Sequence, residues 1–270
     1  MSRASDYPPR LAGLTVPDGG TILRYGPDPD QYGELWPARG GPVVVLVHGG
    51  YWRSRYRLDL MHALAADLQR HGCTVWNLEY RRVGGSGGGW PGTFSDVAAG
   101  LDMLADLAAH HDLDLTRVAV VGHSAGGHLG LWSAARARPA QDPAKGPRVR
   151  PSLVVALAPV SDLVLAHERG LSDDATAGLL GVSHAQDPER YRRASPIELL
   201  PMGVRQIVVH GTADDAVPFD MSVRYCAKAR ASGDDCELVD LPGADHFDLI
   251  DPESPAWEDV RHRLLAELGG

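Results

Sequence analysis

The chain has 270 residues, of which 44% are hydrophobic, and a formal net charge of -9. This length and composition predict one soluble globular domain around a single core, and the acidic balance argues against a nucleic-acid-binding protein, because phosphate binding calls for clustered Lys and Arg. No apolar run approaches the roughly 18 residues of a membrane helix, and the N-terminal MSRASDYPPR lacks the apolar segment of a secretory signal, so we expect a cytoplasmic protein with no membrane partner.

The cysteines and histidines show no metal-ligand spacing. The chain has three cysteines, Cys73, Cys226 and Cys236. Because this number is odd, we expect each to be a small buried hydrophobic side chain or a free thiol. Most of the 12 histidines lie in helical or loop contexts without paired Cys or carboxylates. The glycine run at 84–89 lacks the following Lys-Ser/Thr pair of a phosphate-binding loop. We therefore expect neither a metal nor a cofactor.

Residues 1–40 predict an irregular lead-in followed by a hairpin at a sheet edge. Residues 7–18 are rich in Pro and Gly, whereas 21–25 and 32–36 have the character of short strands. The connecting GPDPDQ consists mostly of turn-forming residues.

The first buried strand is predicted at 43–47, where a continuous β-branched run is typical of a strand covered on both faces. It leads into HGGYW at 48–52, whose glycines let the backbone fold back and present N–H groups. A helix is then expected at 58–70 and a strand at 74–78. Thr93 with Asp96 has the spacing of an N-cap pair for a helix reaching about His110.

The most informative stretch is GHSAGGHLGLW at 122–132. An apolar strand at 117–121 precedes it and an Ala/Leu-rich helix follows. In G-x-S-x-G between a strand and a helix, the serine occupies the apex of a strained turn, and the glycines remove Cβ atoms that would collide there. Ser124 is therefore a candidate nucleophile.

The second half of the chain continues the alternation of strands and helices. A surface loop is expected at 136–151 and a strand at 152–157. Residues 163–200 are expected to form a helical insertion, which is either a small cap over the site or a surface excursion. Strands at 206–209 and 236–241 alternate with helices at 219–231 and 255–268. This pattern predicts an α/β fold with a mostly parallel, doubly wound sheet, helices on both faces, and a ligand site beyond the carboxyl ends of the strands.

Three chemically relevant loops follow strands in the order serine, acid, histidine. Ser124 is followed by Asp214 or Asp215 in HGTADDAVP and by His246 in GADHFD. A serine hydroxyl needs a histidine to take its proton and a carboxylate to orient the imidazole.

Donors for the tetrahedral oxyanion are expected from the backbone N–H groups of Ala125, Gly50 and Tyr51. His210 is a competing base, but it lies on the shoulder of its strand beside the acid loop. Of the remaining histidines, His48 is expected to brace the oxyanion loop, and His128 to lie on the nucleophile helix.

These motifs resemble the α/β-hydrolase superfamily from about residue 43 to the C-terminus. HGGYW and GHSAGGHL together resemble the kynurenine formamidase (arylformamidase) group and the hormone-sensitive-lipase-like esterases. The resemblance implies an α/β-hydrolase fold, and the family pattern HGxxDxxVP places the acid at Asp214. Trp52, Trp90 and Phe247 lie next to the predicted catalytic loops, where they either line a substrate pocket or anchor those loops in the core.

The resemblance implies a serine hydrolase that cleaves a small acyl ester or an aryl formamide through an acyl-enzyme on Ser124. An aminopeptidase-like peptidase, an acyltransferase and a non-catalytic binding protein of the same fold are the alternatives. The expected partner is a small-molecule ester or amide. The sequence leaves the oligomeric state open, with a homodimer among the states it allows.

Overall fold

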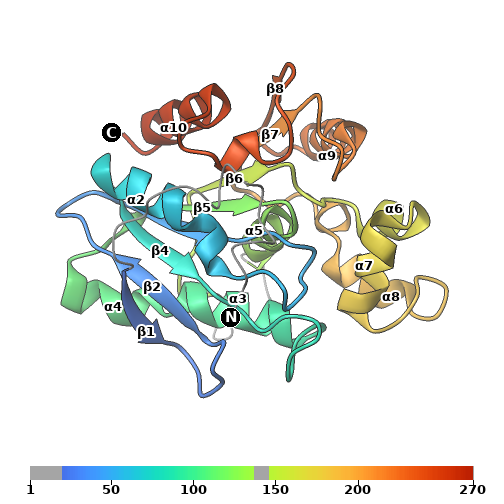
Figure 1. Ribbon diagram of the computed structural model, residues 1–270, viewed down its shortest axis with the longest axis horizontal. Helices are drawn as coiled ribbons and strands as arrows, with labels where there is room; N and C mark the ends of the chain where they lie inside the picture. The colour runs from blue at the N-terminus through green and yellow to red at the C-terminus, as the bar shows by residue number, and fades with distance from the viewer. Residues whose placement is uncertain (1–19, 137–145, 270) are drawn as a thin grey trace.

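An eight-stranded sheet in the order β1-β2-β4-β3-β5-β6-β7-β8 forms the centre of the computed structural model, which describes residues 20–136 and 146–269 (Figure 1). The predicted lead-in and most of the predicted loop at 136–151 lie outside these ranges. The strands are β1 Thr21–Arg24, β2 Tyr32–Trp36, β3 Pro42–Val47, β4 Thr74–Leu78, β5 Asp114–His123, β6 Leu153–Leu157, β7 Arg205–Gly211 and β8 Cys236–Leu241. β1 and β2 pair antiparallel at one edge, β2 is antiparallel to β4, and all other pairs are parallel. The predicted edge hairpin and mostly parallel sheet are confirmed.

Helices cover both faces of this sheet because successive strand residues point to opposite sides. Val44 and Leu46 pack with Trp257 on one face, whereas Val43 and Val45 belong to the cluster on the other. The first face is covered by α2 (His62–Arg70) and α10 (Pro255–Glu267). The second is covered by α3 (Gly92–Asp102), α4 (Leu104–His111), α5 (Ala125–Ala135) and α9 (Phe219–Ala231). The doubly wound α/β-hydrolase architecture predicted from the sequence is therefore confirmed.

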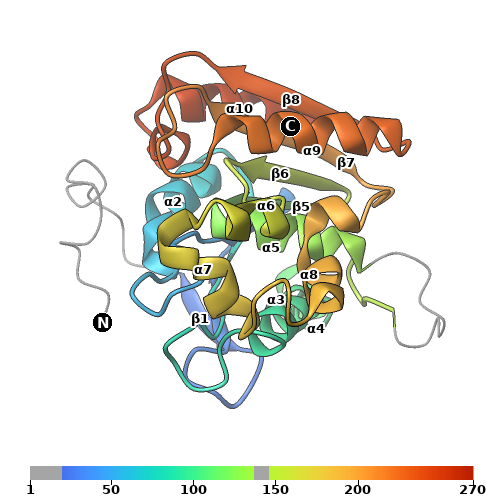
Figure 2. The ribbon, with the colours of Figure 1, turned by 90° about the vertical axis from the view of Figure 1, so that its right-hand side faces the viewer.

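The segment between β6 and β7 consists of α6 (Leu163–Glu168), α7 (Leu171–Leu180), α8 (Pro188–Ala194) and a short 3-10 helix at Pro196–Glu198. Figures 1 and 2 show these helices gathered at one side of the molecule. Asp162 and Asp187 cap α6 and α8 by accepting from backbone N–H groups three residues later. The expected helical insertion is present.

The helix after the glycine-rich loop begins differently from the prediction. Its N-cap is Pro91, and Thr93 and Asp96 do not form the predicted capping pair. Instead, the Thr93 hydroxyl donates to the Arg81 carbonyl, and both carboxylate oxygens of Asp96 bind the Arg81 guanidinium. The charge-assisted hydrogen bonds between Asp96 and Arg81 are stronger than a local N-cap bond. Thr93 and Asp96 therefore bind the loop that precedes the helix instead of capping it.

Two predicted helices are also subdivided. Residues 58–61 form a 3-10 turn before α2, and Met103 separates α3 from α4. Across the described ranges, every helix is too short or too polar to span a bilayer.

Candidate active site

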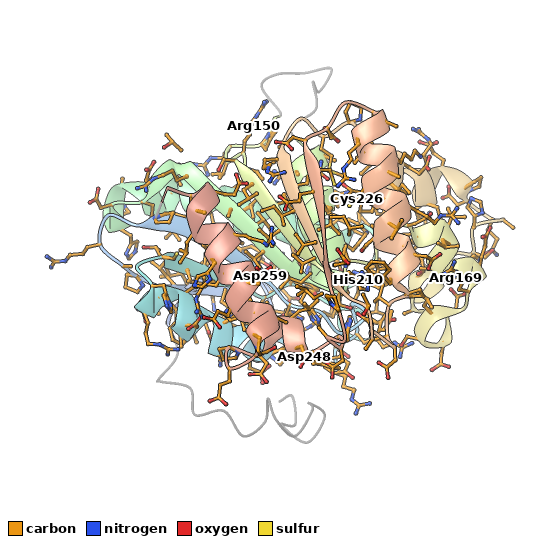
Figure 3. The ribbon with its side chains drawn as sticks, turned by 90° about the horizontal axis from the view of Figure 1, so that it is seen from above. Arg150, Arg169, His210, Cys226, Asp248 and Asp259 are labelled. Carbon is orange, nitrogen blue, oxygen red and sulfur yellow. The ribbon has the colours of Figure 1, made fainter. Side chains whose placement is uncertain are left out.

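The predicted catalytic loops follow β3, β5, β7 and β8, and parallel pairing brings their carboxyl ends to one edge of the sheet. Figure 3 shows His210, at the end of β7, and Asp248, just after β8, at the same end of these strands. Arg150, which precedes β6, lies at the opposite end. The topology therefore gathers the loops that carry Ser124, Asp214 and His246.

Ser124 occupies a sharp turn between β5 and α5, with φ 57° and ψ -117°. This backbone conformation is sparsely populated for a residue with a side chain and is held by the surrounding packing. A Cβ on Gly122 would lie 2.2 Å from the Gly126 carbonyl oxygen, and one on Gly126 would lie 2.0 Å from that of Val47. The G-x-S-x-G glycines are thus required by backbone packed directly against backbone.

Asp214 and His246 form a short hydrogen bond. His246 Nδ1 lies 2.6 Å from Asp214 Oδ2, and the other carboxylate oxygen accepts from the backbone N–H groups of Ala216 and Val217. The Asp214 side chain is fully buried, whereas Asp215 is exposed. Of the two adjacent acids, Asp214 is the one that faces the histidine.

The electrostatics of Asp214 favour its ionised form. Burial acts to raise the pKa of Asp214, but hydrogen bonds from His210 and His246 outweigh burial and hold the pKa well below its usual range. This carboxylate can therefore orient His246 and stabilise an imidazolium without taking the proton itself.

His210 also approaches Asp214, at 3.3 Å from Nε2 to Oδ2, but both of its ring nitrogens are engaged. Nε2 lies 3.0 Å from the Val217 carbonyl oxygen, and Nδ1 lies 2.7 Å from Ser222 Oγ. A ring with both nitrogens bound has none left for proton transfer, which favours His246 over His210 as the base.

The HGGYW loop lies against the nucleophile turn. A Cβ on Gly49 would stand 3.0 Å from Ser124 Cβ, and Gly50 has φ 104° with the Tyr56 side chain where its own Cβ would be. Among the described residues, no backbone hydrogen bond engages the N–H groups of Gly50, Tyr51 or Ala125. These three donors, predicted for the oxyanion, are therefore available.

Two further contacts join the loops, and both involve side chains whose role the sequence did not indicate. The Tyr51 hydroxyl donates to the Ala216 carbonyl at 2.6 Å, which ties the HGGYW loop to the acid loop. His123 Nε2 donates to the His246 carbonyl at 3.0 Å. Burial lowers the pKa of His123 well below its usual value, so the ring is neutral. Neither contact follows from sequence spacing, since the partners lie more than a hundred residues apart.

The model of the BD-FAE family matches residues 37–228, which is most of the chain. The chain belongs to the BD-FAE family. Among curated proteins it is 27% identical to Esterase LipC of Mycobacterium tuberculosis, over 84% of this chain and 59% of that protein. It is 24% identical to a probable isoprenylcysteine alpha-carbonyl methylesterase of rice, Oryza sativa, over 84% of this chain and 57% of that protein. The BD-FAE chain thus spans little more than half the length of these relatives.

Solved structures show the same fold. Inhibited Esterase B from Lactobacillus rhamnosis superposes with a TM-score of 0.81 and 21% identity, over 96% of this chain and 90% of that one. A truncated carbohydrate esterase from gut microbiota superposes with a TM-score of 0.77 and 18% identity, over 95% of this chain and 98% of that one. The predicted α/β-hydrolase fold is confirmed, while the resemblances to esterases and to formamidases stay predictions.

The aromatic side chains beside the loops differ in position. Trp52 of this BD-FAE member is fully buried and donates from Nε1 to His128 Nδ1 at 3.2 Å, so it anchors the HGGYW loop in the core and presents no surface to a ligand. Trp90 is half-buried, with its ring edge-on to Phe94 and the Arg193 guanidinium 5.4 Å from its centre. The burial of Trp52 corrects the expectation that it lines a substrate pocket, because its ring packs in the core and binds His128 there.

Phe247 is half-buried, and its ring lies 5.2 Å from that of His246. It is the predicted substrate-contacting aromatic that the structure places directly beside a catalytic candidate.

A cavity of about 510 Å³ lies away from these loops, between the insertion and α9. Leu165, Glu168, Arg192 and Arg224 contribute to its wall. Ser124, Asp214 and His246 do not line it, so it is separate from the candidate active site.

Proposed function

We propose that this BD-FAE member is a serine esterase that cleaves small acyl esters through an acyl-enzyme on Ser124. The observation that carries the proposal is the 2.6 Å contact between Asp214 and His246 at the sheet edge that also holds the strained Ser124 turn. The esterase names of several relatives support the same reaction class.

In the proposed mechanism, His246 Nε2 takes the proton of the Ser124 hydroxyl as Oγ attacks the ester carbonyl carbon. Asp214 accepts from Nδ1–H throughout, which keeps the second nitrogen free as a base and stabilises the imidazolium that forms. The mechanism requires the His246 ring and the Ser124 hydroxyl to come within hydrogen-bond distance when substrate binds.

The tetrahedral oxyanion would accept from the N–H groups of Ala125, Gly50 and Tyr51. The imidazolium then returns its proton to the departing alcohol, leaving an acyl group on Ser124 Oγ. Water repeats the sequence, with His246 again as base, and releases the acid. Preorganised donors stabilise charge that exists only in the transition state, so they raise kcat.

For the substrate we propose a compact acyl group, formyl or acetyl, on an aromatic or otherwise apolar leaving group. Phe247 beside His246 supports an aromatic contact near the reacting carbonyl. The insertion at 163–200 is proposed as a small cap, because the Arg53 guanidinium that follows HGGYW donates to the Ser172 carbonyl within it.

Replacement of the nucleophile tests the mechanism. We expect Ser124→Ala to lower kcat by about 10⁴-fold to 10⁶-fold while the protein stays folded, because only a hydroxyl is lost. A fluorophosphonate probe should label the natural protein and leave the variant unlabelled. Equal labelling of both proteins would remove Ser124 from the nucleophile role.

A substrate panel tests the specificity. We expect kcat/KM for p-nitrophenyl acetate to exceed that for the octanoyl ester, and a preference for the longer chain would exclude the compact acyl pocket. N-formylkynurenine in the same panel separates formamidase from esterase activity. Cleavage of small esters without cleavage of the formamide would make this a plain carboxylesterase.

A further inference from the structure

A fully buried contact between a histidine and a carboxylate lies behind the HGGYW loop. His48 and Glu79 both have no exposed side-chain surface, and His48 Nε2 lies 3.0 Å from Glu79 Oε1. On the other side of the ring, His48 Nδ1 lies 2.8 Å from the Gly49 carbonyl oxygen. The Tyr80 ring stacks on the imidazole with centroids 4.4 Å apart, and its hydroxyl donates to the His48 carbonyl. The ring therefore has one orientation.

The partners of Glu79 establish which group holds the protons. Its two carboxylate oxygens accept from the backbone N–H groups of Tyr80 and Leu58 and from the Arg82 guanidinium. Burial acts to raise the pKa of Glu79, but the attraction of His48 and its hydrogen bond lower the pKa overall. Glu79 is therefore an ionised acceptor.

Both nitrogens of His48 consequently face acceptors. A carbonyl oxygen and a carboxylate can only accept, so either neutral tautomer would place a ring lone pair against an oxygen within 3.0 Å. Protonation of both nitrogens satisfies both contacts. Arg82 and Arg57 also face Glu79, and Asp30 binds both arginines, so this network surrounds the pair with charges of both signs.

We propose that His48 is a buried imidazolium that holds and polarises the Gly49–Gly50 peptide, and so positions the Gly50 N–H as an oxyanion donor. The Gly49 carbonyl and the Gly50 N–H belong to one trans peptide, so they point in opposite directions. A cation fixed on the oxygen prevents the plane from flipping and draws electron density away from N–H, which strengthens it as a donor. This positioning role rests on the proposed esterase function, and Glu79 is the counter-ion that maintains it.

The protonation of His48 can be measured without any activity. In long-range ¹H–¹⁵N spectra of the natural protein at neutral pH, we expect both His48 ring nitrogens to carry a proton, because both face acceptor oxygens. The absence of these signals from His48→Asn would assign them. A His48 ring that is neutral at pH 7 would overturn the proposal, whatever the substrate is.

The kinetic consequence is tested in Glu79→Gln, which keeps the side-chain size and removes the counter-ion. We expect kcat for an acetyl ester to fall about 10-fold with KM nearly unchanged, since the oxyanion exists only in the transition state. The ¹⁵N–¹H signal of Gly50 should move in the same variant. A folded Glu79→Gln protein with the natural kcat and an unmoved Gly50 signal would contradict the proposal.

Asp67→Asn is the matched control, because Asp67 is also a buried carboxylate, bound to Trp257 Nε1 and Arg261 but remote from the catalytic loops. It should lower stability and leave kcat unchanged. Equal kcat losses in the two variants would reduce the Glu79 effect to general destabilisation and refute the positioning role. Failure of the proposed function has a different signature, namely no fluorophosphonate labelling of Ser124, and the His48 spectra decide the protonation state in either case.

Discussion

Asp214 serves two histidines with one carboxylate, and the contacts differ in length. Oδ2 lies 2.6 Å from His246 and 3.3 Å from His210, while Oδ1 is held by two backbone N–H groups. The backbone contacts fix the carboxylate plane before any substrate arrives. The carboxylate that accepts the His246 hydrogen bond is thus oriented by the acid loop itself, and His210 gives it a further contact.

Adjacent acids provide a matched pair of variants. We expect Asp214→Asn to lower kcat about 10⁴-fold, because an amide favours the wrong imidazole tautomer. Asp215→Asn should change kcat little, since this side chain is exposed. The measurement is kcat for an acetyl ester in both variants. Greater damage from Asp215→Asn would show that the acid is the neighbouring residue.

For single residues, the sequence indicated which side chains are candidates for the site better than it indicated which groups they contact. Ser124, Asp214 and His246 were singled out as a candidate triad because they stand in short motifs after buried strands. The contacts of Asp214 with His210 and of Tyr51 with Ala216 were not predicted, because they depend on how separate loops approach each other. Trp52 shows the same limit, since its neighbours in the sequence do not reveal whether the ring turns toward the core or the solvent.

The nucleophile helix α5 is packed more closely at its start than along its length. A Cβ at Gly126 meets the carbonyl oxygens of Val47 and His48, which are backbone and cannot move away singly. A Cβ at Gly130 comes within 3.2 Å only of a Val120 methyl group. Backbone packing therefore excludes a side chain at Gly126, whereas the space at Gly130 can accept a methyl group.

This contrast gives a stability prediction. We expect Gly126→Ala to lower the free energy of unfolding by about 3 kcal/mol through overpacking. Gly130→Ala should stay within about 1 kcal/mol of the natural protein, because the helix propensity of Ala offsets the tight contact. Urea unfolding of both variants measures the difference. Similar midpoints for the two would contradict the packing described for the nucleophile turn.

The HGGYW and acid loops are coupled through one hydroxyl. We expect Tyr51→Phe to lower kcat/KM about 5-fold to 10-fold, because the lost bond of roughly 1 kcal/mol frees the loop that carries two of the proposed oxyanion donors. Tyr225→Phe is the control. Tyr225 lies on α9, away from the site, and its hydroxyl donates to the Gln206 side chain at 2.6 Å. A loss of kcat/KM in the control equal to that in Tyr51→Phe would argue against specific coupling.

Strands and helices were predictable where the pattern of buried apolar residues determines the element. Examples are the continuous apolar run of β3 and the helical spacing of apolar residues in α9. The start of α3 was not, because Asp96 is taken by Arg81 from the preceding loop. A local capping rule cannot anticipate a partner that reaches the same atoms from another segment.

Across the part of the chain that the structure describes, burial raises the pKa of six tyrosines: Tyr25, Tyr32, Tyr51, Tyr80, Tyr191 and Tyr225. Burial also raises the pKa of the Cys73 thiol to about 11. Each group is held neutral in the folded state because its charged form is poorly solvated there. Their combined contribution makes the fold sensitive to base.

The sign of this sensitivity follows from linkage. A raised folded-state pKa contributes stability that is complete below the unfolded value of about 10 and is lost as pH rises through the folded value. For Tyr51 and Tyr191 the folded value is about 12. We therefore expect the free energy of unfolding to fall steadily above about pH 10. Tyrosinate absorbance should rise together with the loss of helical circular dichroism, and full ionisation of a still-folded protein would disprove this account.

His128 gives the insertion a consequence for protein engineering. Its Nδ1 accepts from Trp52 and its Nε2 donates to the Ala194 carbonyl, so a single imidazole on the nucleophile helix spans the HGGYW loop and the last residue of α8. Burial lowers the pKa of His128 to about 4, which keeps this donor–acceptor polarity at neutral pH. A chimera that exchanges residues 163–200 for the insertion of a relative must therefore preserve the carbonyl at the α8 terminus. The junction of such a graft should therefore lie before the end of α8, so that Ala194 and its carbonyl come from the recipient protein.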